Sequence, residues 1–244
     1  MKKILPLFTA ACVLAFLPSC RFIRISDEIK EEIKNNGVSW VGEGSGEQIS
    51  ASDNIITRND VTGDFHALTC NLPGDVIYTP GECALTISGP DNVLEHIKVG
   101  NDNGVLTVTS DGARFRKLRK LTIHVSSPVM EEMVFNGAVD FKAPQGITAL
   151  DFKLTVNGAG DIEISGLKAD SASVQVNGAG DATVSKLDCE ALTVAIAGAG
   201  DAVVSGRAGR ADLSISGAGD IDAVELKCED ISTKVRGVGT IKRP

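Results

Sequence analysis

Five aspartates in the C-terminal half recur at a regular spacing and are the first candidates for a functional site. They are Asp140, Asp161, Asp181, Asp201 and Asp220. If equivalent carboxylates stack in a column, they lie about 5 Å apart and repel one another, so something must offset their charge. Calcium ions, as in glycine- and aspartate-rich β-rolls, or backbone N–H groups of each residue's own turn would both serve. Calcium rolls have a shorter repeat, which favours the turn caps and predicts no metal.

A second candidate is the basic segment RFRKLRK at residues 114–120, which stands out in a chain with a formal net charge of −8. Its cationic residues are Arg114, Arg116, Lys117, Arg119 and Lys120. Such a cluster could contact an anionic glycan or lipid headgroups. It could also be a solvated strand edge whose charges prevent aggregation. The second interpretation is the commoner one for such a run.

The cysteines raise the question of disulfides. Cys70 and Cys83 flank the turn-rich segment NLPGDVIYTPGE, which could fold back as a hairpin and bring them together. Spacing alone does not decide the pairing, so a bridge and two free thiols both stay open. Cys189 and Cys228 occupy the same position two repeats apart, a separation of about 9.6 Å at the usual strand spacing. A disulfide needs Cα atoms within about 7 Å, so we expect free thiols there.

The sequence has no motif that would mark an enzyme. It contains no nucleophile elbow, P-loop, zinc-ligand spacing or paired dinucleotide fingerprint. The three histidines, His66, His96 and His124, are not spaced as metal ligands. Carbohydrate-active β-helix enzymes need clustered acidic or basic groups and sugar-stacking aromatics, whereas Trp and Tyr occur once each. We therefore expect no catalytic residues and no cofactor, and the acidic charge argues against a nucleic-acid partner.

The aspartates belong to a pentapeptide that occurs six times in variant forms, from NGAVD at 136–140 to RGVGT at 236–240. Its first glycines are 19 to 21 residues apart: Gly137, Gly158, Gly178, Gly198, Gly217 and Gly237. A period near 20 is typical of a solenoid in which each repeat is one coil. A tight corner needs positive φ, which glycine adopts without steric cost. We therefore interpret the motif first as a structural corner between two strands, and only second as a possible binding site.

Apolar and polar residues alternate on both sides of each pentapeptide, as in strands with one buried face. Two positions before the first glycine the residues are Val156, Val176, Ile196, Ile215 and Val235. Each repeat therefore holds two short strands. Stacking equivalent strands predicts an all-β fold, a parallel β-helix or β-solenoid with coils of about 20 residues. The less regular segment 53–135 would supply the first coils and one cap.

The N-terminal segment has the pattern of an export signal. Residues 1–19 combine two lysines with an apolar run and a small residue before Cys20. The sequence LPSC at 17–20 resembles a bacterial lipoprotein box, which implies that Cys20 is lipidated and fixes the chain to a membrane. Residues 20–53 would form the tether, with a short amphipathic helix within 21–36. Residues 54–244 would form the β-solenoid domain.

The NGAGD, AGAGD and SGAGD turns and the upstream segments GDFHALTCNLPGDVIYT and NGVLTVTS resemble the head GIN domain family of auto-transporter adhesins. The resemblance covers most of residues 54–244. It implies a right-handed β-helix and a role in cell adhesion, and it brings no established catalytic residues. RGVGT departs from the pattern because it lacks the aspartate, which fits a terminal coil.

Together these features predict a non-enzymatic lipoprotein of the cell envelope, anchored in the outer membrane through Cys20. Its β-solenoid would bind a surface glycan or a protein partner. Two alternatives stay open, a carbohydrate-active β-helix enzyme and a structural spacer of the envelope. A cluster of acids or histidines in one groove would favour the enzyme.

Overall fold

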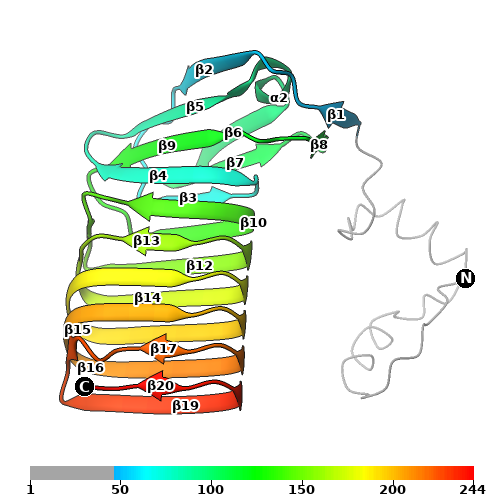
Figure 1. The fold of residues 1–244 in the computed structure, drawn as a ribbon. Coiled ribbons are helices and arrows are strands. Elements are labelled where there is room, and N and C mark those ends of the chain that lie inside the picture. Colours follow the sequence, from blue (N-terminus) through cyan, green and yellow to red (C-terminus); the bar gives the residue numbers. More distant parts are fainter. Residues whose placement is uncertain (1–46) are drawn as a thin grey trace, which may run out of the picture. The chain divides into compact units, whose positions relative to one another are not determined.

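The computed structural model describes residues 47–244, which fold almost entirely into β-strands (Figure 1). The predicted signal segment 1–19, the lipidation site Cys20 and the predicted helix within 21–36 lie outside the described residues. The strands form a β-solenoid, as the period of the pentapeptide predicts.

Each coil of the solenoid contributes strands that pair in parallel with the equivalent strands of the neighbouring coils. The strands that lead into the pentapeptide corners pair without any shift in register. Within the pair of β15 (Ala182–Ala199) and β16 (Ala202–Ala218) the register shifts by one residue between Val184 and Leu187. The strands are β10 (Glu132–Ala143), β11 (Ile147–Thr148), β12 (Asp151–Ala159), β13 (Ile162–Ile164), β14 (Leu167–Ala179), β15 (Ala182–Ala199), β16 (Ala202–Ala218), β17 (Ile221–Asp222), β18 (Leu226–Lys227), β19 (Asp230–Val238) and β20 (Ile241–Lys242).

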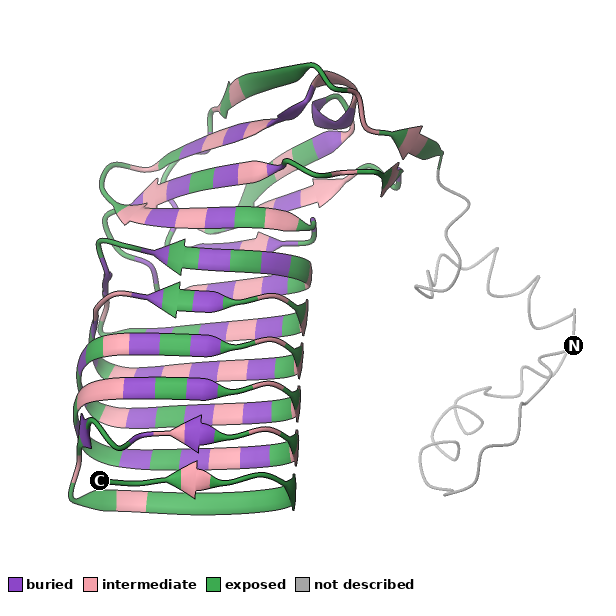
Figure 2. Ribbon diagram, in the orientation of Figure 1, coloured by how far each residue is buried: buried purple, intermediate pink, exposed green. Residues whose placement is uncertain are grey.

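The predicted interior column is present. Cα pairing places the following residues in one line through the coils: Val156, Val176, Ile196, Ile215 and Val235. The first four are at most 2% exposed, because each packs between two coils. Buried residues alternate with less buried ones along the strands of the inner coils, β12, β14, β15 and β16, whereas the terminal strand β19 is exposed along almost its whole length (Figure 2). Val235 is 44% exposed because its strand β19 pairs with β16 alone.

The glycine corners satisfy two requirements at once. Gly158, Gly178 and Gly198 have φ values of 150°, 150° and 141°, in the region that favours glycine. Stacking adds a second requirement, because a Cβ atom on Gly178 would overlap the carbonyl oxygen of Gly158 in the neighbouring coil. The corner therefore needs glycine for its backbone angle and for the close approach of the next coil.

One further coil lies before the repeats. It consists of β3 (Ala67–Cys70) and β4 (Gly74–Pro80), which both pair in parallel with β10. On their other side lie β7 (Val105–Ser110) and β9 (Thr122–Ser127), again in parallel. The order of these coils in space therefore differs from their order in the sequence (Figure 1).

Antiparallel strands close this end of the solenoid. β5 (Ala84–Pro90) pairs with β9 and with β2 (Ile55–Asp60), while β6 (Ile97–Asp102) pairs with β7. The short helix α2 (Asp91–Leu94) joins β5 to β6 and buries its two apolar residues. The prediction that the irregular segment 53–135 supplies the first coils and a cap is confirmed.

Larger side chains fill the core of this capped end. Tyr78 is buried and its hydroxyl donates to the carbonyl oxygen of Ser127 at 3.0 Å. Phe135 and Phe141 pack with ring centroids 5.2 Å apart where the first coil meets the repeats. The repeats beyond them use mainly aliphatic residues and alanine.

Candidate functional site

The five aspartates form the predicted column, on the exposed corner of the coils. Each carboxylate accepts a hydrogen bond from the backbone N–H of the equivalent residue in the next coil, which is an aspartate for the first four and Thr240 for Asp220. For example, the N–H of Asp201 donates to Oδ1 of Asp181 at 2.9 Å. The same contact joins Asp140 to Asp161, Asp161 to Asp181, Asp201 to Asp220, and Asp220 to Thr240.

These bonds correct one expectation. The carboxylates were expected to accept from their own turns, but they cross from coil to coil, because in-register stacking brings each carboxylate beneath the next corner. They offset the like-charge repulsion and tie neighbouring coils together. Within residues 47–244, no group of three or more metal-ligating side chains is close enough to hold an ion.

A second polar row runs beside the aspartates and was not expected. The Nδ2 of Asn177 donates to Oδ1 of Asn157 at 2.9 Å, and Asn157 donates in the same way to Asn136. Asn136 continues the row to Asn71 at 2.7 Å. The signal was the asparagine that opens the motif NGAGD, because identical amides one coil apart can pair along a parallel stack. The row ends at Ala197, which has no side-chain amide.

The basic segment lies at the capped end, beside the first described strand. β8 (Arg114–Arg116) pairs in parallel with β1 (Gln48–Ser50), and the N–H of Ala51 donates to the carbonyl oxygen of Arg116 at 2.9 Å. Phe115 and Leu118 pack against the core, which leaves all five cationic side chains exposed. None of these five forms an ion pair with another residue of the part that the structure describes.

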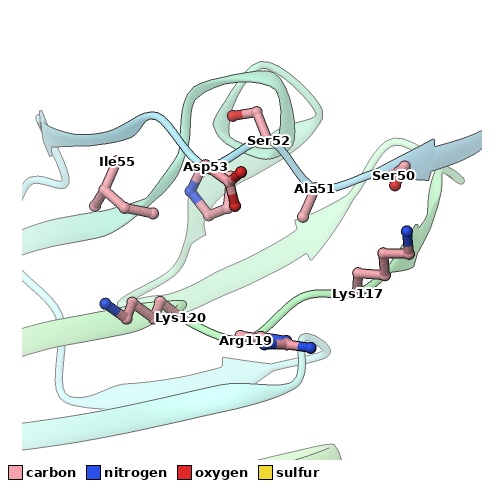
Figure 3. Close-up of a pocket in the computed structure, with 9 residues that line it drawn as sticks. Ser50, Ala51, Ser52, Asp53, Ile55, Lys117, Arg119 and Lys120 are labelled. Carbon is pink, nitrogen blue, oxygen red and sulfur yellow. The ribbon is translucent and has the colours of Figure 1, made fainter.

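Part of this segment lines a groove of about 510 Å³, hereafter the basic groove. One wall is the segment 50–55 and the other carries Lys117, Arg119 and Lys120 (Figure 3). Asp53 is the one carboxylate among the lining residues, so the groove has a net positive charge. Arg114 and Arg116 do not line it.

Hydrogen bonds behind the first wall hold its shape. The Ser52 hydroxyl donates to Oδ1 of Asp91 at 2.5 Å, and Nδ2 of Asn54 donates to its other oxygen at 2.8 Å. The bond from Ser52, followed by that from Asn54, holds the pKa of Asp91 below its usual range. Nδ2 of Asn92 also donates to the carbonyl oxygen of Ser50 at 2.8 Å. The wall is therefore anchored at both ends to the start of α2.

The candidate disulfide is absent, and the reason is topological. The segment between Cys70 and Cys83 is not a hairpin but a coil corner followed by the seven-residue strand β4. A strand of that length spans more than about 20 Å, so the thiols lie at its opposite ends. Both are free. The Cys70 thiol is buried beside the carbonyl oxygen of Leu72, and that of Cys83 lies beside Phe65.

Cys189 and Cys228 are free thiols, as expected. Cys189 pairs with Ala208 of the next coil, so one coil separates it from Cys228. Burial raises the pKa of the Cys189 thiol to about 11, with smaller contributions from Cys228 and Asp188. Burial likewise raises the pKa of Cys70 to about 11. These pKa values indicate structural thiols and not reactive ones.

The match to a known family covers most of the described chain. The model of the family described as "Putative auto-transporter adhesin, head GIN domain" matches residues 64–185 and again 155–242. The chain belongs to this family. Two overlapping matches fit a repeat whose coils can be aligned in more than one register. No protein of the curated set matches the chain.

Solved structures of similar fold share the solenoid. A protein from Bacteroides fragilis titled a putative adhesin is 25% identical, with a TM-score of 0.67 over 80% of this chain and 100% of its own. A putative adhesin from Parabacteroides distasonis is 18% identical, with a TM-score of 0.71 over 80% and 84%. A structure from the same organism titled a putative lipid binding protein is 15% identical, with a TM-score of 0.69 over 81% and 100%. The family, together with the 25% identical structure from Bacteroides fragilis, indicates an adhesin-like protein.

No helix within the described part of the chain is long and apolar enough to cross a membrane.

Proposed function

We propose that the chain is an envelope lipoprotein that acts by binding, as an adhesin-like module, and not by catalysis. The observation that carries the proposal is the in-register stack that runs from β10 to β19. Successive coils hold equivalent side chains at fixed positions, which makes the outer faces long and rigid. Membership of an adhesin family supports the same function.

The outward residues of these faces suit an extended partner. In the strand before each corner they are polar or small, and they include Thr155, Gln175, Ala195 and Ser214, which are half-buried. Because their backbone is fixed by two neighbouring strands, a partner that lies along the face would lose little additional freedom on the side of this protein. A surface glycan or a segment of another protein has the required length.

The direct test is a binding screen with the chain from residue 20 onward. It would be applied to intact bacterial cells and to arrayed glycans, with binding measured by fluorescence. We expect retention on cells or on a defined class of glycan. A matched variant, Thr155→Arg with Gln175→Arg, places two bulky charges on the face and should weaken retention at least tenfold. Uniformly flat results with a folded protein would overturn the binding function and favour the spacer.

Anchoring through Cys20 forms the second part of the proposal. The lipoprotein-like LPSC sequence supports it, and the acyl chains would hold the domain at the outer membrane. Intact mass spectrometry of protein from membranes should show acyl groups on an N-terminal Cys20, and Cys20→Ser should release the protein. A mature N-terminus at another residue, or an unmodified Cys20, would refute the anchor. Protease treatment of intact cells would then distinguish a surface location from a periplasmic one.

A further inference from the structure

The three cations of the basic groove are not explained by protection of a strand edge. Lys117, Arg119 and Lys120 follow the end of β8 and precede β9, in a segment without regular structure. Charges that block edge-to-edge pairing lie on the edge strand itself, as Arg114 and Arg116 do. Another reason is therefore needed for three further cations, all turned outward, in an acidic chain.

The backbone is arranged to place these charges at the groove. Lys117 has a φ of 57°, a left-handed conformation that a lysine adopts at some cost in energy. Leu118 and the buried Leu121 hold the following segment against the core. Arg119 and Lys120 therefore lie across the groove from the wall formed by residues 50–55, and their side chains extend in opposite directions along it (Figure 3).

The lining favours a phosphate over a sugar ring. The opposite wall contributes two serines, Ser50 and Ser52, and Asp53 as its one carboxylate. The lining contains no aromatic side chain on which a sugar could stack. Lysine and arginine side chains with nearby hydroxyls are groups that bind phosphate oxygens.

The position of the groove indicates where such a phosphate would come from. The groove wall continues directly from β1, the first described strand, so the chain from Cys20 enters the fold at this wall. If Cys20 is anchored, this is the end of the domain that the tether connects to the bilayer. Tethering raises the effective concentration of headgroups at this end, and each added cation strengthens attraction to an anionic surface.

We propose that the basic groove binds the phosphate of an anionic lipid headgroup, so that the capped end of the solenoid docks on the membrane that carries the tether. This inference rests on the proposed anchoring. It assigns different roles to the two ends of the domain. The capped end would contact lipid, and the stacked coils would extend away from the bilayer toward a partner.

The test uses the chain from residue 20 onward with Cys20→Ser, so that no acyl group contributes. Its sedimentation is measured with vesicles of phosphatidylcholine alone and with vesicles that also contain phosphatidylglycerol. We expect binding to the anionic vesicles and its loss at high salt, because exposed charges are screened. The triple variant Lys117→Gly, Arg119→Gln, Lys120→Gln should bind about a hundredfold more weakly, from the effect of three charges near an anionic surface.

A second triple variant provides the matched control. Lys142→Gln, Lys153→Gln and Lys168→Gln remove the same charge from exposed positions on the coils and should bind as the parent does. The single variant Lys117→Gly relieves the left-handed strain, so weaker vesicle binding with an equal or higher melting temperature excludes misfolding as the cause. Equal binding to neutral vesicles, or equal losses in both triple variants, would overturn the proposal.

Two further arms separate the sources of phosphate and the two proposals. If millimolar inorganic phosphate or an acidic polysaccharide displaces the protein from vesicles completely, the groove is a general anion site and the lipid assignment fails. Mass spectrometry of Cys20 reports on anchoring alone. Vesicle binding through the groove together with an unmodified Cys20 would refute the lipid anchor and support phosphate binding by the groove. An acylated Cys20 without vesicle binding would support the lipid anchor and refute phosphate binding by the groove.

Discussion

The repeated coils and the capped end build the same core by different means. From β12 to β17 the coils use small side chains, glycine corners and rows of identical polar groups. Between β1 and β9 the chain uses aromatic residues, antiparallel strands and hydrogen bonds that occur once. In the repeated coils, a residue must fit the equivalent residues of both neighbouring coils, which gives a rigid body. In the capped end each contact occurs once, so its residues are not held to a repeat. The basic groove lies in this capped end.

The largest expected effect tests the dependence of the coils on their corners. Gly178→Val should destabilise the protein by about 2 to 6 kcal/mol, because the left-handed strain and the overlap with the neighbouring coil each cost about 1 to 3 kcal/mol. Chemical denaturation would measure the change. Gly166→Ala is the matched control, because Gly166 has no positive φ and its Cβ would lie 3.8 Å from the nearest atom. Similar losses in both variants would contradict the corner model.

A smaller effect should separate an inner coil from an outer one. Val176 and Val235 occupy the same column, but Val176 is 1% exposed and Val235 is 44% exposed. Val176→Ala should cost about 2 kcal/mol, from two buried methyl groups and the cavity that they leave. Val235→Ala should cost less than half as much by the same denaturation measurement. Equal costs would show that burial in the stack does not determine how much each valine contributes to stability.

The aspartate row should contribute less, because it is exposed. Asp181→Ala removes the acceptor for the N–H of Asp201 and should cost about 1 kcal/mol, the usual net value of one hydrogen bond. Asp181→Asn keeps an acceptor oxygen and relieves like-charge repulsion, so its stability should match the parent. Calcium should change neither the melting temperature nor the heat measured by calorimetry. A calcium-dependent rise in melting temperature would instead support calcium binding by the column of aspartates.

The last effect belongs to the capped end, is absent at neutral pH and appears only above about pH 9. The Cys70 thiol has its pKa raised from 9.0 to about 11 by burial, so the folded state holds this proton more tightly than the unfolded state does. Its contribution is complete below pH 9 and is lost as the pH rises from 9 to about 11. Cys70→Ala should flatten the decline of stability over this range. An unchanged slope would argue that Cys70 is not the titrating group.

The coils could be predicted from the sequence because the features that define a coil lie within one repeat of about 20 residues. The period of the pentapeptide, the alternation around Val156 and Val176, and the glycine corners each report on a single turn of chain. Parallel stacking then follows, since each coil can bury its apolar face only against another coil. The same logic predicted that Cys189 and Cys228 stay apart.

The capped end was less predictable because its contacts join distant segments. The segment 50–55 and Lys117 lie more than 60 positions apart in the sequence and meet only through β1 and β8. The basic segment was therefore visible, but its groove was not. The sequence does not decide the fold around Cys70 for a related reason, since a turn-rich segment looks the same in a hairpin and in a coil corner. The aspartate partners were assigned to the wrong coil because spacing alone does not say which neighbour a side chain reaches.

Stacking in register also makes the molecule extensible. Each inner coil contacts only the coil on either side and presents the same surface to both, so one repeat could be duplicated or deleted without disturbing the cap. Every added coil would lengthen the protein by about 4.8 Å, the spacing between paired strands. The number of NGAGD-type repeats therefore sets the length of the solenoid. Duplication or deletion of one repeat would change the distance between the capped end and the last coil by one strand spacing.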